Sequence, residues 1–146
     1  MINKTPIITF IFLLTSTLFL AQTIVSTSPE NKKIILEEYT GIHCTYCPDG
    51  HEIAQSLKDA NPDNIFIINI HTGGYATPSS GEPDFRTSFG DAIAAQSNLT
   101  GYPSGSVNRQ YFSGLSMNGG TAMGRGSWSS ACLLYTSPSP RDKRQS

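Results

Sequence analysis

Apolar residues along this chain gather in short continuous runs and in one helical pattern. Residues 33–39 and 65–71 are rich in isoleucine and leucine, which is typical of strands covered on both faces. Between these runs, apolar residues recur every three or four positions and predict a helix over residues 48–60 with one face toward the strands. A strand, a helix and a strand of these lengths predict a βαβ unit with a parallel strand pair.

The second half of the chain has weaker patterns. Residues 72–83 are rich in Gly, Pro, Ser and Thr and predict an exposed loop. A second helix is expected over residues 84–96, with Asp84 as its amino-terminal cap. A turn that contains Gly and Pro then leads to a weak strand near residues 106–109, and a final helix is expected to begin at Ser127.

The amino-terminal end has the pattern of a targeting segment. Residues 1–22 combine a lysine, an apolar core and small residues at a cleavage point, as in a secretory signal peptide, and residues 23–32 form a polar linker. The apolar core is shorter than the roughly 20 residues that span a bilayer. We therefore expect an exported protein with no membrane span in its mature chain.

The carboxyl-terminal end differs in kind from the rest of the chain. Cys132 to Asp142 resembles the translation of a transposon-type DNA sequencing adaptor. Residues 132–146 are therefore expected to be a disordered, adaptor-derived artefact, the alternative being a genuine Ser/Pro-rich tail. On this interpretation one domain covers residues 33–131 and is truncated before its last helix is complete.

Setting the ends aside changes the charge and the cysteine count. The whole chain carries a formal net charge of −1, but Arg141, Lys143 and Arg144 lie in the tail, so the remaining domain is more acidic. An acidic domain does not attract nucleic acid, and we expect none as a partner. Of the 3 cysteines, only Cys44 and Cys47 lie in the domain. An exported pair persists as a disulfide or as a cycling dithiol.

Cys44 and Cys47 are separated by two residues and followed by Pro48. Because proline is tolerated in the first turn of a helix, the pair is expected at the amino terminus of the helix over residues 48–60. Backbone N–H groups and the helix dipole stabilise a thiolate there, and the thiolate is the nucleophile in disulfide exchange. On this topology Cys44 is the attacking thiol and Cys47 the resolving thiol.

Two other uses of the pair stay open. Copper or zinc binding through Cys44, Cys47 and His51 is one, because His51 lies four residues after Cys47 on the same helical face. The domain has no second cysteine pair for a zinc site, and Pro48 stands where covalent haem needs histidine, so we expect no metal and no cofactor. The other use is a structural disulfide, although closing so short a loop adds little stability.

The order of strand, Cys-x-x-Cys at a helix start, strand, helix and Gly-Tyr-Pro before another strand resembles the thioredoxin fold. The resemblance implies a three-layer α/β domain with a central mixed sheet. It implies that Pro103 is a cis-proline that faces the dithiol and, with Tyr102, shapes a substrate groove. It also implies that Glu38, six residues before Cys44, is a buried acid that assists proton transfer to the resolving thiol.

The sequence departs from thioredoxin around the cysteines. His43 precedes the first cysteine where thioredoxin has an aromatic residue, and Thr45 and Tyr46 replace its Gly-Pro pair. These departures leave the redox potential and the direction of electron flow open.

Two longer motifs resemble one bacterial family. Residues 37–48 match Glu-Glu-x-Thr-Gly-x-x-Cys-x-x-Cys-Pro, and residues 101–109 match Gly-Tyr-Pro-x-Gly-x-Val-Asn-Arg. Both motifs occur in the twenty-eight-kilodalton outer-membrane protein family of Gram-negative bacteria. The resemblance implies an envelope protein, in the periplasm or outer membrane, whose natural chain continues into a further domain.

Together these patterns predict an exported thiol-disulfide oxidoreductase-like protein of the cell envelope that works through Cys44 and Cys47. Its expected partners are protein thiols or disulfides and an envelope redox partner. The alternative is a non-catalytic outer-membrane or adhesion module in which the same cysteines form a structural disulfide.

Overall fold

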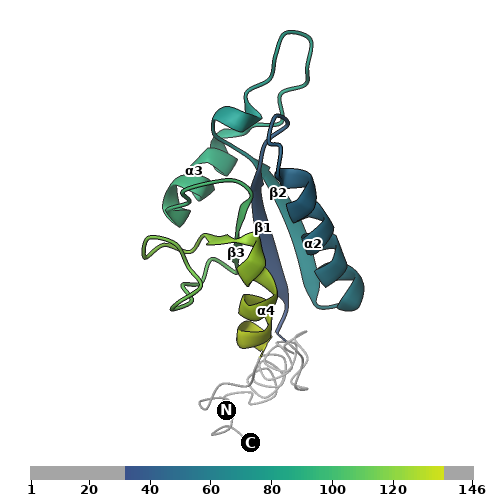
Figure 1. The fold of residues 1–146 in the computed structure, drawn as a ribbon, viewed down its shortest axis with the longest axis vertical. Helices are drawn as coiled ribbons and strands as arrows, with labels where there is room; N and C mark the ends of the chain where they lie inside the picture. Colours follow the sequence, from purple (N-terminus) through teal and green to yellow (C-terminus); the bar gives the residue numbers. More distant parts are fainter. Residues whose placement is uncertain (1–31, 137–146) are drawn as a thin grey trace, which may run out of the picture. The chain divides into compact units, whose positions relative to one another are not determined.

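The computed structural model describes residues 32–136 (Figure 1). The predicted signal peptide over 1–22, nearly all of the predicted linker over 23–32 and the tail beyond residue 136 lie outside the described residues. None of the helices in the described range is long and apolar enough to cross a membrane. The elements, in chain order, are β1 (Ile34–Thr40), α2 (Cys47–Ala60), β2 (Ile65–His71), the short 3-10 helix η2 (Gly74–Ala76), α3 (Ser88–Ser97), β3 (Ser104–Val107), β4 (Met123–Gly124), the short 3-10 helix η3 (Arg125–Ser127) and α4 (Trp128–Thr136).

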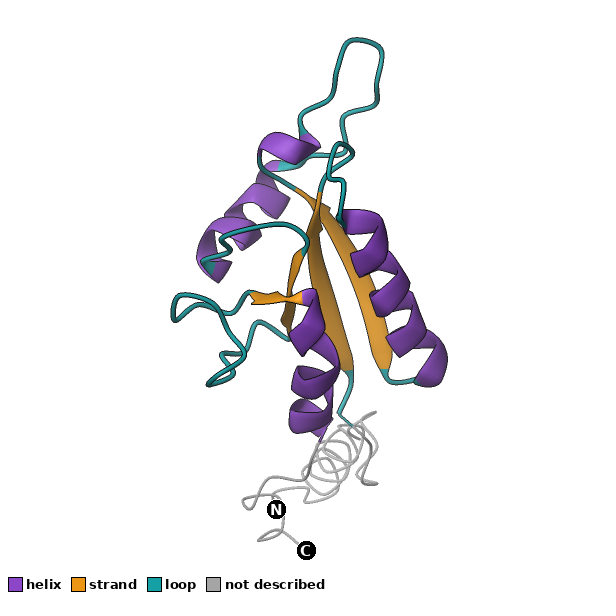
Figure 2. Cartoon of the chain, in the orientation of Figure 1, coloured by secondary structure: helices purple, strands orange, loops and turns teal. Residues whose placement is uncertain are grey.

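The strands of the described residues form one mixed sheet in the order β2-β1-β3-β4 (Figure 2). β1 and β2 run parallel, with Ile34 opposite Ile65 and Thr40 opposite His71, whereas β3 runs antiparallel to both β1 and β4. This arrangement confirms the predicted α/β fold with a central mixed sheet. A βαβ unit followed by a helix, two antiparallel strands and a last helix is also consistent with a thioredoxin-like domain.

β1 lies inside the sheet, and its successive side chains point to opposite faces. The larger core, which α2 and α4 cover, consists of Ile34, Leu36, Ala54, Ile65, Val107, Phe112, Met123, Trp128, Ala131 and Cys132. The smaller core, which α3 covers, consists of Tyr39, Ile70, Ala94 and Ala122. Helices therefore cover both faces of the sheet, and the two neighbouring glutamates of β1 point into different layers.

Trp128 anchors α4 to the sheet, and its side chain is fully buried. The indole lies over Gly105 of β3, where an added Cβ atom would come within 2.9 Å of the ring. The indole Nε1 donates a hydrogen bond of 3.3 Å to the carbonyl oxygen of Met123, so its polar group is satisfied in the core. The glycine therefore gives the last helix room to approach the sheet.

The last helix continues into residues that the sequence interpretation assigned to the tail. Residues from Cys132 onward were expected to be disordered, but residues 132–136 continue α4. Cys132 lies one helical turn after Trp128 and is only 5% exposed, so it extends the apolar face that packs on the sheet. Burial raises the pKa of the Cys132 thiol to about 11, which keeps that thiol protonated and unreactive.

The boundaries of β3 and α3 also differ from the prediction. β3 ends at Val107 because Asn108 and Arg109 adopt left-handed backbone angles, with φ of 49° and 51°. α3 begins at Ser88, so the predicted cap at Asp84 is wrong. The Asp84 carboxylate instead binds the side chain of Arg86, and these hydrogen bonds lower the pKa of Asp84 to about 2.

Thr87 is the true cap of α3, because its hydroxyl accepts a hydrogen bond of 3.0 Å from the backbone N–H of Gly90. Replacing Thr87 with alanine is expected to lower the free energy of unfolding by about 1 kcal/mol. Urea unfolding of both proteins measures the difference. Ser88→Ala, one residue along and without this cap contact, is the control and should change the unfolding midpoint less.

Candidate redox site

The disulfide between Cys44 and Cys47 lies where β1 leads into α2, with an S–S distance of 2.12 Å. The backbone N–H of Cys44 donates to the carbonyl of Gly41 at 3.1 Å, and that of Cys47 donates to the carbonyl of Cys44 at 3.2 Å. These bonds form a tight turn into the helix, which begins at Cys47 with proline in its first turn. Cys44 is 8% exposed and Cys47 is 1% exposed, so an incoming thiol has better access to Cys44.

The loop after β2 packs against this turn. The backbone N–H of His43 donates to the carbonyl of Tyr75 at 2.9 Å, and a Cβ atom on Gly41 would come within 2.3 Å of the Tyr75 backbone. The His43 imidazole lies 2.9 Å from the Glu82 carboxylate on the same loop. The pKa of Glu82 is lowered, first by the backbone N–H of Ser79 and further by His43. The cysteine turn is therefore supported from the side of β2.

Pro103 lies against α2 on the other side. The Tyr102–Pro103 peptide bond is cis, as the resemblance to thioredoxin implied. A Cβ atom added to Gly50 would lie 2.9 Å from Cγ of Pro103 and 2.8 Å from Oε1 of Glu38. Gly50 is three residues after Cys47, in the next turn of the helix. The cis-proline, the buried acid and the cysteine-bearing helix therefore meet at Gly50.

Glu38 is fully buried on the face of β1 that α2 covers. Its Oε2 lies 2.9 Å from Nδ1 of His51, and its Oε1 has no hydrogen-bond partner among the described residues. Burial raises the pKa of Glu38, and the hydrogen bond and charge of His51 only partly oppose this effect. A carboxyl group with a raised pKa can hold and release a proton closer to neutral pH.

His51 connects this buried acid to solvent. It lies on α2, its side chain is 39% exposed, and its Nε2 lies 3.4 Å from the hydroxyl of Thr40. In the interpretation of the sequence, His51 had a role only as a metal ligand beside the cysteines. The structure points its ring toward Glu38 instead. The signal that could have indicated this contact is the helical spacing from Cys47 together with the position of Glu38 on the covered face of the strand.

Tyr102 and Pro103 line a groove of 510 Å³ beside the helix, together with Ile53, Met117 and Arg125 among others. The Tyr102 hydroxyl occupies the space above Gly73, where a Cβ atom would come within 2.3 Å. Its ring meets that of Tyr75 edge-on at 5.6 Å. Burial raises the pKa of Tyr102, so its hydroxyl stays neutral.

Glu37 points into the opposite layer and has a different role from Glu38. It is 4% exposed and binds the guanidinium of Arg109, with Nε–Oε1 at 2.8 Å and Nη2–Oε1 at 2.5 Å. The hydroxyl of Ser106 donates to its Oε2 at 2.9 Å. The hydrogen bonds to Glu37 raise the pKa of Arg109. This pair joins β1 to the end of β3 and lies on the face of the sheet away from α2.

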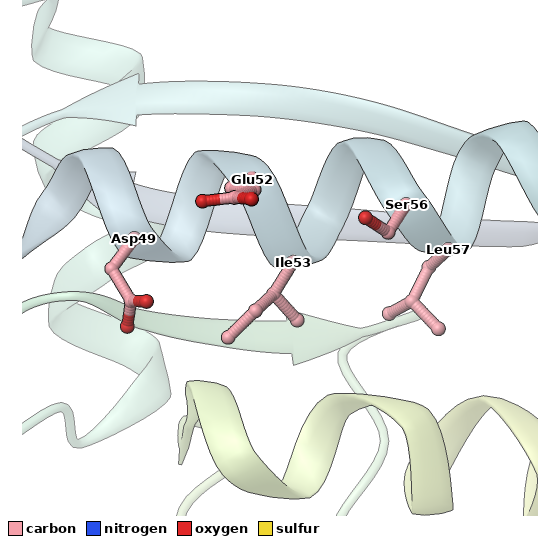
Figure 3. A pocket seen from close by; sticks show the side chains of 5 residues that line it. All are labelled: Asp49, Glu52, Ile53, Ser56 and Leu57. Atoms are coloured by element: carbon pink, nitrogen blue, oxygen red, sulfur yellow. The ribbon is translucent and has the colours of Figure 1, made fainter.

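Within residues 32–136 no group of three or more His, Cys, Asp or Glu side chains is arranged to hold a metal ion. The alternative of a metal site from Cys44, Cys47 and His51 has no support in this geometry, because the sulfurs bind each other and His51 contacts Glu38. A second groove, of 420 Å³, is lined by residues of α2 other than the cysteines, and Figure 3 shows Asp49, Ile53 and Leu57 extending from the helix on its α4 side.

Comparison with known proteins adds the fold alone. No family model and no curated protein matches the chain. A crystal structure of a protein from Agrobacterium tumefaciens is similar, with a TM-score of 0.51 and 13% sequence identity over 81% of this chain. The chain spans about half of that protein's length (48%). This likeness supports the α/β arrangement and does not indicate an activity for this chain.

Proposed function

We propose that this chain is a thioredoxin-like thiol-disulfide exchange protein of the bacterial cell envelope, related to the outer-membrane family whose motifs it resembles. One observation carries the proposal: Glu38 and the cis-proline Pro103 both pack against α2 at Gly50, one turn beyond Cys47. A disulfide that only staples a turn needs neither a buried acid with an unpaired oxygen nor a cis-proline beside its helix. Buried polar groups without partners cost stability, and they persist most often where chemistry uses them.

The chemistry starts from the disulfide seen here. A substrate thiolate attacks Sγ of Cys44, which forms a mixed disulfide and breaks the Cys44–Cys47 bond. The electron pair of that bond passes to Sγ of Cys47, which takes a proton from Glu38. A second substrate thiolate then attacks the substrate sulfur of the mixed disulfide and releases the Cys44 thiolate. The substrate dithiol loses two electrons, the protein disulfide gains them, and the reverse sequence reduces a substrate disulfide.

Substrate binding falls to the groove beside Pro103. Tyr102 and Pro103 line this groove, and Tyr46, which is 66% exposed, lies between the two cysteines in sequence. An extended polypeptide segment that contains a thiol or disulfide fits this arrangement. The proposed partners are therefore protein thiols or disulfides and an envelope protein that resets the redox state of the pair.

Exchange assays with the full chain test the proposal. A Cys132→Ala background leaves Cys44 and Cys47 as the only thiols, and this parent should equilibrate with glutathione and catalyse the reduction or oxidation of a model protein disulfide. Cys44→Ser and Cys47→Ser should each lower turnover at least about a hundredfold. A pair that stays oxidised under strong reductant and supports no turnover would instead establish the structural-disulfide module, which the low exposure of both cysteines favours.

A further inference from the structure

Glu38 has no direct route to water. Its side chain is completely buried, its Oε1 lies close to Gly50, and its Oε2 shares a hydrogen bond with Nδ1 of His51. An acid that hands a proton to Cys47 once in each exchange cycle must also regain one. The His51 ring, 39% exposed, is in contact with both the carboxylate and solvent.

We propose that His51 relays protons between bulk water and Glu38, and so lets the buried acid reset in each cycle. This inference rests on the proposed exchange function and assigns it a residue that acts on Glu38, not on the sulfurs. The 2.9 Å contact between Nδ1 and Oε2 lets one proton move between imidazole and carboxylate, and the second ring nitrogen carries it onward. His51 is thus a positioning and proton-relay residue.

The proton balance follows from the two ring nitrogens. When Glu38 gives its proton to the Cys47 thiolate, the carboxylate takes a proton from Nδ1 of a protonated His51, and water reprotonates the neutral ring. In the reverse direction Glu38 takes the proton of Cys47, and the ring passes it to water. The relay shortens the time for which the buried carboxylate is ionised. This is an advantage because burial disfavours the ionised form.

Other titratable groups near the relay have different partners. His71, at the end of β2, has a pKa lowered first by burial and further by the charge of His51, so it does not compete as a cation. Asp49 on α2 forms an ion pair with Arg125 of η3. Thr40 of β1 contacts Nε2 of His51 at 3.4 Å and does not titrate near neutral pH. Among these groups, only His51 contacts Glu38.

Single-turnover reduction of the Cys132→Ala full chain by excess dithiothreitol tests the relay, with acid quenching and alkylated thiols counted by mass spectrometry. His51→Gln should slow the reaction about tenfold at neutral pH and flatten its pH profile, because the amide cannot carry a proton. His51→Ala should be slow as well, and free imidazole should restore much of its rate. Gln55→Ala, on the exposed face of the same helix, should match the parent.

The outcomes separate the relay from the exchange function. A parent that does not exchange overturns both. A parent that exchanges, with His51→Gln at the parental rate and pH profile or with no imidazole rescue of His51→Ala, overturns the relay alone. If the His51 variants fail to fold, the parent and Glu38→Gln are compared in H₂O and D₂O. The relay predicts a larger solvent isotope effect for the parent, and equal effects would contradict it.

Discussion

Replacing Gly50 with alanine is expected to destabilise the protein by about 1–3 kcal/mol, the range for overpacking a core site. In an ordinary helix the same change stabilises, because alanine has the higher helix propensity. Here the added methyl group would stand 2.8 Å from Oε1 of Glu38 and 2.9 Å from the ring of Pro103. The carboxylate is fully buried and the proline ring is rigid, so relief requires α2 to move away from β1.

This change should also slow disulfide exchange, because the same shift moves Cys47 away from Glu38, the acid proposed to protonate it. Urea unfolding gives the stability difference, and single-turnover reduction gives the rate. Gly126→Ala is the matched control, since a Cβ atom there has open space. A Gly50→Ala protein that is more stable than the wild type, with an unchanged rate, would show that the close packing at Gly50 has no functional part.

Much of the fold was predictable because local signals agreed with tertiary packing. Proline after the second cysteine indicated where α2 begins, and the isoleucine-rich run of residues 65–71 indicated the strand β2. The expectation that both faces of this strand are covered is wrong, because β2 lies at the edge of the described sheet and Phe66 and Ile68 are 45% and 47% exposed. The start of α3 was misjudged because Asp84 and Thr87 are both residue types that favour capping positions, and the structure uses Thr87. The helical residues 132–136 were missed because they were set aside with residues 132–142, whose sequence resembles a translated sequencing adaptor.

The candidate site was predictable only as far as the family resemblance reached. Glu38 and Pro103 came from motif positions, and the structure places both beside α2. The contact between Glu38 and His51 was missed although the spacing of His51 from Cys47 gave a signal for it, because the rotation of α2 about its axis over β1 decides which side chains meet. The pairing of Glu37 with Arg109 was missed for a similar reason, since it requires the left-handed turn after β3.

Glu38→Gln is expected to lower the exchange rate about a hundredfold, because an amide cannot give a proton to Cys47 or take one from it. At neutral pH the same substitution should raise the free energy of unfolding, although it lowers the exchange rate. The pKa of Glu38 is raised in the folded protein from an ordinary value of 4.5. At pH values between the unfolded pKa and the raised folded pKa, the folded state binds more protons than the unfolded state. The stability of the wild type therefore falls as pH rises through this range.

The loss of stability caused by burying the ionised Glu38 carboxylate is therefore absent below the unfolded pKa of Glu38 and complete above its folded pKa. The free energy of unfolding of Glu38→Gln, relative to wild type, should rise as pH increases through this window, and urea unfolding at several pH values measures it. Glu37→Gln is the matched control on the neighbouring position: losing the ion pair with Arg109 should lower stability at neutral pH and leave the exchange rate unchanged. A Glu38→Gln protein that exchanges at the wild-type rate would remove the acid from the mechanism, whereas a pH-independent stability difference would show that the buried carboxyl titrates as it does in the unfolded chain.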